Sequence, residues 1–348
     1  MLQILTYEHI ERAEWSRLVL ASTTGTWFQT PEAYDFFASQ PELFMPFAFG
    51  LIDDQSPKAN HKSQLRAVCV GYVTLEKSAL KQFFTRRAII IGGPALANDA
   101  TDQEVHILMM AVKDFLKSQA IYIETRNFND YSRWQLAFKE AEFDYQPHLN
   151  FHVDTTSLEI VDANLGKSRK RDIRTTVREG VQIVDLTNDV PNKSEKVKMV
   201  HEYYKILKNL YATKVKTPLF PESFFQVLAN HLDARFLLTK FHGQIIGGTV
   251  CVEQTNKCLY EWFVCGEDGV YPHVFPSSYA TYAGIQYAAG HGLPRFDMMG
   301  AGKPDEAYGV RDFKAKFGGK EVEHGRFVCV TKPLLYKIGV LGVKILRK

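Results

Sequence analysis

The feature that most constrains the fold is a run of three consecutive β-rich segments in the second half of the chain. These segments cover residues 234–241, 244–253 and 257–265. Because His242-Gly243 and the tetrapeptide from Gln254 to Lys257 are typical of tight turns, they predict three neighbouring antiparallel strands. A helix over 276–291 and a strand that begins at Arg295 follow them.

The first half of the chain shows the same order of elements. Its expected strands cover residues 47–52, 65–75, 88–92 and 120–126, and its expected helices cover 7–20 and 101–118. The polar segment 53–64 predicts a hairpin loop between the first two strands. Thr30-Pro31 is typical of a helix start, and Thr101 with Glu104 predicts a capping box.

This repeated order excludes a regular doubly wound parallel sheet, which needs strict alternation of strands and helices. The expected fold class is α/β, of the α+β type, with two tandem related domains. Each domain is expected to hold a mixed, mostly antiparallel sheet flanked by helices. We expect the domains at residues 1–153 and 154–331, and an amphipathic tail over 332–348 docked on the first domain.

Composition is that of an ordinary soluble protein. The 348 residues are 45% hydrophobic and 23% charged, with a formal net charge of +3, so a nucleic-acid partner would need a local basic patch. The sequence shows no secretory signal and no apolar stretch of membrane-spanning length. The five cysteines are irregularly spaced, which predicts buried free thiols in a reducing, cytoplasmic compartment and no metal site.

The densest basic segment lies at the expected start of the second domain. A helix over 164–179 would place Arg171, Arg174 and Arg178 on one face and turn Ile173 and Val177 toward the core. Arginine forks can hold phosphate groups in a bidentate manner. A solvated helix face explains the same pattern, so both interpretations stay open.

A second segment, residues 296–319, joins a buried strand to a glycine-rich loop and to paired aromatic and cationic residues. Lys314 lies between Phe313 and Phe317, where an ammonium group could be held against apolar walls and stabilise negative charge. A surface loop with core aromatics explains the pattern equally well. No general acid–base pair stands out, and no G-x-S-x-G, H-E-x-x-H or P-loop motif supports a hydrolase, metalloprotease or NTPase.

Five motifs together resemble the Fem (FemABX) family of peptidyltransferases, and the resemblance spans nearly the whole chain. They are Phe28-Gln-Thr-Pro-Glu, Gly92-Gly-Pro, the basic segment 168–181, Phe296-Asp-Met-Met-Gly and Asp312-Phe-Lys-Ala-Lys-Phe-Gly-Gly. The last of these is the most specific. The resemblance implies two tandem GNAT-like domains and an enzyme of the acyltransferase class.

The family resemblance implies transfer of an amino acid from aminoacyl-tRNA to an amine of a peptidoglycan precursor peptide or a similar acceptor. It assigns Phe313 and Lys314 to catalysis, through donor binding and steadying of transition-state charge. Five further residues are expected to bind substrate: Arg171, Arg174, Lys214, Tyr260 and Phe317. Aminoacyl-tRNA acts here as a co-substrate, and the resemblance implies no bound cofactor.

Two departures from the family pattern bear on the substrates. Phe37 stands where the family carries a lysine that meets the diphosphate of its acceptor, and Ala33 replaces a tryptophan. The diphosphate-linked acceptor is therefore open. The loop from Gly266 carries acids where acyl-CoA would need donors, which favours tRNA over acyl-CoA.

Two alternatives remain beside aminoacyl transfer: a GNAT-type N-acyltransferase that uses acyl-CoA on a sugar or peptide amine, and a binding protein of the same fold without chemistry. The tail, as an alternative to docking, would rest on the inner face of an anionic membrane. The expected assembly is a monomer or a dimer.

Overall fold

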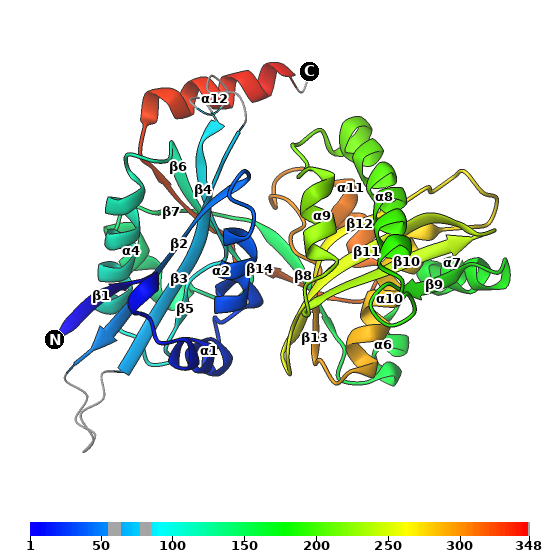
Figure 1. Ribbon diagram of the computed structural model, residues 1–348, viewed down its shortest axis with the longest axis horizontal. Helices are drawn as coiled ribbons and strands as arrows, with labels where there is room; N and C mark the ends of the chain where they lie inside the picture. The colour runs from blue at the N-terminus through cyan, green and yellow to red at the C-terminus, as the bar shows by residue number, and fades with distance from the viewer. Residues whose placement is uncertain (55–63, 77–81, 83–84, 347–348) are drawn as a thin grey trace. The chain divides into compact units, whose positions relative to one another are not determined.

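A computed structural model of the chain describes residues 1–54, 64–76, 82 and 85–346 (Figure 1). Contacts divide the chain into two compact units, which we describe separately. Unit 1 comprises Met1–His148 and Glu323–Lys348, and unit 2 comprises Leu149–Val322. The predicted hairpin loop 53–64 lies almost entirely outside the described residues.

Unit 1 is built on a sheet of strand order β1-β2-β3-β4-β6-β15-β7, with β5 paired to β3. Its strands are β1 (Leu2–Thr6), β2 (Phe44–Asp53), β3 (Gln64–Thr74), β4 (Arg87–Gly92), β5 (Ala95–Leu96), β6 (Tyr122–Asn127), β7 (Asp144–Gln146) and β15 (Arg326–Val330). Only β4 and β6 pair in parallel among the registers recorded for this sheet. The sheet is therefore mixed and mostly antiparallel, as predicted.

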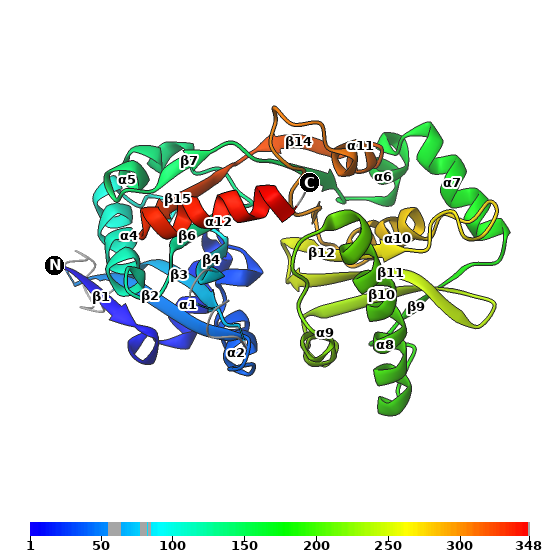
Figure 2. The same ribbon diagram turned by 90° about the horizontal axis from the view of Figure 1, so that it is seen from above.

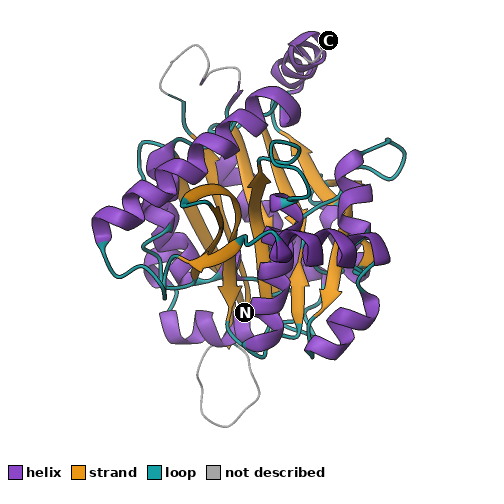
Figure 3. Ribbon diagram, turned by 90° about the vertical axis from the view of Figure 1, so that its right-hand side faces the viewer, coloured by secondary structure: helices purple, strands orange, loops and turns teal. Residues whose placement is uncertain are grey.

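Helices cover both faces of this sheet (Figure 1), and Figure 3 distinguishes the helices of the chain, in purple, from its strands, in orange. They are η1 (Tyr7–His9), α1 (Arg12–Ala21), η2 (Trp27–Gln29), α2 (Pro31–Ala38), α4 (Asp102–Leu116), η3 (Ser132–Trp134), α5 (Gln135–Glu140) and α12 (Pro333–Leu346). The predicted N-cap forms, because Thr30 Oγ1 accepts a hydrogen bond from the backbone of Ala33, and the Thr101–Glu104 capping box is complete.

Phe37 lies in the aromatic core of unit 1. Its ring is 1% exposed and packs against Phe44 and Tyr72, with ring centroids 5.2 and 4.5 Å away. Beside it, Gln29 is fully buried and bridges two strands: its amide donates to the carbonyl oxygens of Val70 and Ile91, while its oxygen accepts from Val70 N at 2.7 Å. Both positions thus serve packing in this chain.

Unit 2 is built on a sheet of strand order β14-β8-β13-β12-β11-β10-β9. Its strands are β8 (Leu149–Asp154), β9 (Gln182–Asp185), β10 (Ala234–Phe241), β11 (Gln244–Gln254), β12 (Cys258–Gly266), β13 (Arg295–Asp297) and β14 (Lys320–Glu323). The three predicted neighbours β10, β11 and β12 pair antiparallel, and β12 pairs with β13 in parallel. The predicted sheet class is confirmed here too.

The helices of unit 2 lie on two sides of its sheet: α6, α7 and α10 on one side, α8 and α9 on the other (Figure 2). They are α6 (Leu158–Asn164), α7 (Lys167–Arg178), α8 (Lys193–Leu210), the π-helical η4 (Tyr211–Val215), α9 (Glu222–Leu228), α10 (Pro276–Gly290) and α11 (Gly309–Ala315). The predicted single helix over 164–179 is wrong at its start, because α6 ends at Asn164 and a new helix begins after Gly166.

The ends of the units differ from the predicted domain limits. The division falls at His148, and β15, placed by sequence in the second domain, pairs with β6 and β7 of unit 1. The five-residue sequence Arg326–Val330 carries no local signal of which sheet the strand joins. In the tail, Tyr336 of α12 packs edge-on against Tyr122 of β6, with centroids 5.3 Å apart, while Leu334 and Ile338 are 78% and 55% exposed.

All five cysteines are free and buried, as predicted. No helix in the described part of the chain is both long and apolar enough to cross a membrane.

Candidate functional site

Lys314 lies on α11 and is buried, with 7% of its surface exposed. Its ammonium Nζ donates to the carbonyl oxygen of Met298 and, at 2.7 Å, to that of Gly300. Burial lowers the pKa of Lys314, while the nearby carboxylates of Glu261 and Asp297 act to raise it. The structure therefore encloses a lysine in a dry environment and holds it by backbone oxygens.

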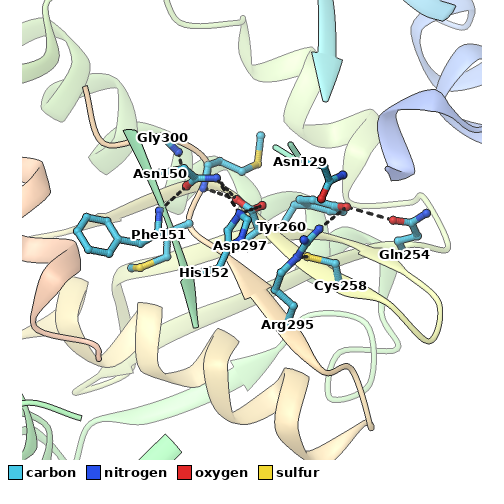
Figure 4. Close-up of polar contacts among 12 residues, drawn as sticks. Asn129, Asn150, Phe151, His152, Gln254, Cys258, Tyr260, Arg295, Asp297 and Gly300 are labelled. Atoms are coloured by element: carbon cyan, nitrogen blue, oxygen red, sulfur yellow. Dashed lines mark hydrogen bonds and ion pairs between the residues drawn. The ribbon is translucent and has the colours of Figure 1, made fainter. Parts of the chain in front are cut away.

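The loop that carries those two carbonyls follows β13 and is fixed by polar side chains from two strands (Figure 4). Asn150 Oδ1 accepts from Gly300 N at 2.8 Å, and its amide donates to Asp297 Oδ1 at 2.7 Å. Asp297 Oδ1 also accepts from Met299 N at 2.8 Å. Met299 and Gly300 both have positive φ, at 53° and 100°, so this tight loop depends on its side-chain clamps.

Asp297 is fully buried and carries its charge with the help of His152. His152 Nε2 lies 3.0 Å from Asp297 Oδ2. Burial by itself would raise the pKa of Asp297, but His152, Arg295 and the Asn150 hydrogen bond outweigh it, and the pKa lies below its ordinary value. The Asp297 carboxylate thus acts electrostatically on the Lys314 ammonium.

Glu261 of β12 is a buried carboxyl that faces the same lysine. It is 3% exposed and accepts a hydrogen bond from Thr249 Oγ1 at 3.2 Å. Burial raises the pKa of Glu261, against the charge of Lys314 and the hydroxyl of Thr281. Lys314 and Glu261 are therefore electrostatically coupled, and each tunes the protonation of the other.

Arg169 of α7 braces the aromatic part of the site. Its guanidinium lies over the rings of Phe313 and Phe317, 4.5 and 4.6 Å from their centroids. It donates to Ser278 Oγ and, at 3.3 Å, to the carbonyl oxygen of Phe313. Two cation–π contacts and two hydrogen bonds from one buried arginine hold Phe313, and with it Lys314, in place.

The junction between α6 and α7 lies against the turn after α11, which explains how Arg169 reaches Phe313. Gly166 N donates to the carbonyl oxygen of Lys316 at 3.0 Å. Gly318 has φ +79°, and a Cβ there would come within 2.2 Å of the carbonyl oxygen of Asn164. The glycine is required by this close approach of two backbones.

The predicted substrate-binding residues are distributed differently. Phe317 is buried beside Phe313, with ring centroids 5.3 Å apart. Arg171 and Arg174 are exposed on α7, and Arg171 pairs with Asp172 at 3.3 Å. Lys214 is exposed in η4. The structure thus gathers Phe313, Lys314 and Phe317, and leaves the two arginines and Lys214 on the surface.

The predicted inward face of α7 needs correction. Ile173 is buried, but Val177 is 49% exposed, and the buried residues of the helix are Arg169, Ile173 and Thr176. The sequence made Arg169 look like one more cation of a solvated face. Only its position four residues before Ile173 hinted at an inward side chain.

Tyr260 is fully buried in β12 and belongs to a polar cluster on the strand (Figure 4). Its hydroxyl donates to Gln254 Oε1 at 3.1 Å, and Arg295 Nη2 donates to it at 3.5 Å. Arg295 also donates to Cys258 Sγ at 3.3 Å. Since Tyr260 is opposite Asp297 in the β12–β13 register, this cluster adjoins the loop that binds Lys314.

The start of α10 bears on the choice of donor. Ser277 N, in its first turn, donates to Asp268 Oδ1 at 3.2 Å. A helix N-terminus favours anions, and the first turn of α10 here holds a carboxylate of the chain itself. This agrees with the sequence interpretation of the acidic loop after Gly266.

Two further features of the described residues bear on function. No group of three or more His, Cys, Asp or Glu side chains there could hold a metal ion. A cavity of about 860 Å³ lies in unit 1 and is lined by residues that include Arg66 and Glu104. These two charges already pair at 2.6 Å, and none of the predicted site residues lines this cavity.

Sequence reasoning missed the residues that organise Lys314, namely Asn150, His152, Arg169, Glu261 and the contact of Asp297 with His152. In the sequence, Asp297 stood only as the second residue of the motif Phe296-Asp-Met-Met-Gly. Glu261 stands inside a strand otherwise rich in apolar and aromatic residues. A charged residue in such a strand is the signal that could have identified it, because an unpaired buried carboxylate is costly.

Comparisons with known proteins bear on the family and the fold. The model of the FemAB family matches residues 235–341, which include β12, β13 and α11. The resemblance to the Fem family is thereby confirmed. No curated protein matches the sequence.

Solved structures show the same fold. The crystal structure of FemX superposes with a TM-score of 0.68 at 11% identity, covering 97% of this chain and 99% of that chain. A tandem GNAT protein from the clavulanic acid biosynthesis pathway superposes with a TM-score of 0.55 at 10% identity, covering 95% of this chain and 99% of that chain. The C-terminal domain of a putative lysylphosphatidylglycerol synthetase from Agrobacterium fabrum superposes with a TM-score of 0.54 at 13% identity. The match covers 81% of this chain and 86% of that chain.

The predicted fold of two tandem GNAT-like domains is confirmed by these neighbours. The FemAB match and the GNAT-like neighbours support a function of the acyltransferase type.

Proposed function

We propose that the protein is an aminoacyltransferase that moves an amino acid from aminoacyl-tRNA to an amine of a cell-wall precursor peptide or a similar acceptor. The observation that carries the proposal is the buried Lys314 ammonium, held by the Met298 and Gly300 carbonyls within the part of the chain that matches the FemAB family.

In the proposed reaction, the acceptor nitrogen attacks the carbonyl carbon of the aminoacyl ester. A C–N bond forms, the C–O bond to the tRNA ribose breaks, and the proton lost by the amine ends on the released ribose hydroxyl. Negative charge develops on the carbonyl oxygen in between. A desolvated ammonium stabilises such charge far better than one in water, which gives Lys314 its role.

The other residues of the site would act through Lys314. Glu261 and Asp297 keep it protonated, since both carboxylates raise its pKa against the effect of burial. Arg169 fixes Phe313, which we assign to donor binding. Arg171, Arg174 and Lys214 would meet the tRNA backbone as exposed cations, and Tyr260 and Phe317 would shape the substrate-binding region from within the fold.

The choice of tRNA over acyl-CoA rests on Asp268. Its carboxylate accepts from Ser277 at the first turn of α10, which disfavours a diphosphate there. The acceptor stays open. A cytoplasmic protein whose tail makes peripheral membrane contact would also meet lipid-linked acceptors.

The test is a transfer assay with the purified full chain. Radiolabelled aminoacyl-tRNA or acetyl-CoA serves as donor, and stem-peptide nucleotides and simple amines serve as acceptors. We expect transfer from aminoacyl-tRNA, and a strong loss in the Lys314→Met variant. Transfer from acetyl-CoA alone would instead establish the GNAT-type alternative, and binding of substrates without turnover would establish the non-catalytic one.

A further inference from the structure

Two arginines of unit 1 face each other across neighbouring strands. Arg126 of β6 and Arg326 of β15 are direct partners in the antiparallel register. Like charges directly opposite each other destabilise a sheet. A pair of this kind therefore needs a compensating negative charge.

The chain supplies only part of that compensation. Glu124 is 6% exposed, and its Oε1 accepts from Arg126 Nε at 3.3 Å and from Arg326 Nη1. One carboxylate thus serves two guanidinium groups through a single oxygen. Arg87 also acts on Glu124, so positive charge is in excess at this place.

Donor groups of the pair are left over. Arg326 Nε is buried and has no hydrogen-bond partner in the described part of the chain. Arg326 Nη2 contacts His148 Nε2 at 2.9 Å, which requires the unprotonated nitrogen of a neutral imidazole. Burial lowers the pKa of Arg326, and so does the charge of Arg126, while Glu124 acts to raise it.

The pair remains within reach of a ligand. The side chains of Arg126 and Arg326 are 35% and 29% exposed. A phosphate or carboxylate group offers paired oxygens that match a guanidinium fork. We propose that Arg126 and Arg326 form a binding site for such an oxyanion on this face of the unit 1 sheet, with Glu124 as the internal group that the ligand supplements.

The site is independent of the proposed chemistry at Lys314, which belongs to unit 2. It also differs from the exposed arginines of α7, because it is built from partly buried guanidinium groups opposed in a sheet. If Glu124 served only to neutralise the pair, an added anion would gain nothing there. Anion binding by the wild-type chain, in which Glu124 is present, separates these two cases.

The test is thermal unfolding of the full chain with inorganic phosphate or acetate as probe, at ionic strength held constant with sodium chloride. We expect the Tm to rise by about 5 °C when the effective anion reaches 100 times its Kd. A rise with phosphate alone identifies a phosphate site, and a rise with acetate alone a carboxylate site.

Three variants complete the design. Arg326→Gln and Arg126→Gln should each abolish the anion-dependent rise, whereas Arg17→Gln, on an exposed arginine of α1 paired with Glu14, should leave it unchanged. Glu124→Gln should bind the anion several-fold more tightly, because it removes the competing carboxylate.

Equilibrium dialysis of radiolabelled phosphate or acetate against the wild-type chain gives the same answer should a variant fail to fold. Absence of binding of both anions to the wild type, or equal binding in Arg326→Gln, would overturn the proposal.

Discussion

Lys314 Nζ donates to the carbonyl oxygen of Gly300 across 2.7 Å, which ties the helix of the FemAB-matched segment to the glycine-rich loop after β13. With Met298 as the second acceptor, two of the three ammonium protons are used and one remains. The same contact therefore orients a cation and fixes a loop. Variants at Lys314 must be judged on both effects.

Replacement of Lys314 by methionine should remove the transfer activity and weaken unit 2. Loss of the ammonium removes charge stabilisation, for which a decrease in kcat of about 100-fold or more is expected. It also leaves the Met298 and Gly300 carbonyls without a donor, at a cost of about 1–3 kcal/mol each. Initial rates with aminoacyl-tRNA and urea unfolding measure the two effects.

Lys316→Met is the matched control, because Lys316 is exposed two residues further along the chain. It should leave both rate and stability unchanged. A folded Lys314→Met variant with wild-type turnover would remove Lys314 from the mechanism and leave it as a loop clamp.

The pH dependence of activity should reveal the coupling between Lys314 and Glu261. Burial lowers the folded-state pKa of Lys314 below 10.5, so the required proton is lost, and activity falls, at a pH below that of an ordinary lysine. Glu261→Gln removes a charge that raises this pKa, so the alkaline limb should move to lower pH. Lys314→Arg, if active, should lack the limb.

The free energy of unfolding should also depend on pH through Glu261. Its folded-state pKa is raised, so the unfolded chain releases the proton first, and stability falls as pH rises from about 4.5 toward the folded-state pKa. Glu261→Gln should reduce this slope in a series of urea titrations. An unchanged slope and an unmoved alkaline limb together would contradict the coupling.

The antiparallel pairing of β10, β11 and β12 was predictable because hairpins join strands that are neighbours in sequence. Tight turns such as His242-Gly243 can be recognised from their residue types. The capping box at Thr101 likewise depends only on residues three positions apart. The pairing of β15 with β6 was not predictable, since it joins residues about 200 apart. The sequence of a short apolar strand does not indicate which other strand it pairs with.

The candidate site was predictable only in part, for a similar reason. Phe313, Lys314 and Phe317 are close in sequence, and in the structure they lie together on and just after α11. Arg169 and Glu261 reach them from distant elements, and both looked ordinary in their own segments. Which arginine of the basic helix points inward depends on the backbone contact between Gly166 and Lys316, which are distant in sequence.

Arg169 and Arg171 should behave as a structural and a surface residue. Arg169→Gln loses two cation–π contacts and its hydrogen bonds to Ser278 and Phe313, so we expect a loss of about 2 kcal/mol in the free energy of unfolding. Arg171→Gln should stay within about 0.5 kcal/mol. Chemical denaturation compares the two variants directly. Equal stability of the two would contradict the structural role of Arg169 beside Phe313.

The exposed cations of α7 should act on tRNA affinity alone. An Arg171→Gln/Arg174→Gln double variant should fold normally, bind tRNA more weakly, and lower the slope of log Kd against log salt by about 2. Lys198→Gln, on an exposed lysine of α8, is the control and should keep the wild-type slope. An unchanged slope in the double variant would assign these arginines to a solvated face.

The tail offers a test in which docking and membrane contact depend on different side chains. Tyr336 packs on Tyr122, so Tyr336→Ala should lower the Tm of unit 1 while leaving the outward face intact. Leu334 and Ile338 lie one turn apart and are exposed, so Leu334→Ser/Ile338→Ser should leave the Tm unchanged.

The same two variants separate the tail's roles on vesicles. If α12 also rests on lipid, the wild type and Tyr336→Ala should cosediment with phosphatidylglycerol-containing vesicles, and the double serine variant should not. Weak binding to phosphatidylcholine alone is expected, because Lys337 contributes through anionic headgroups. Failure of the wild type to bind anionic vesicles would leave α12 as a docked helix only, since its exposed leucine and isoleucine would then have no lipid contact to make.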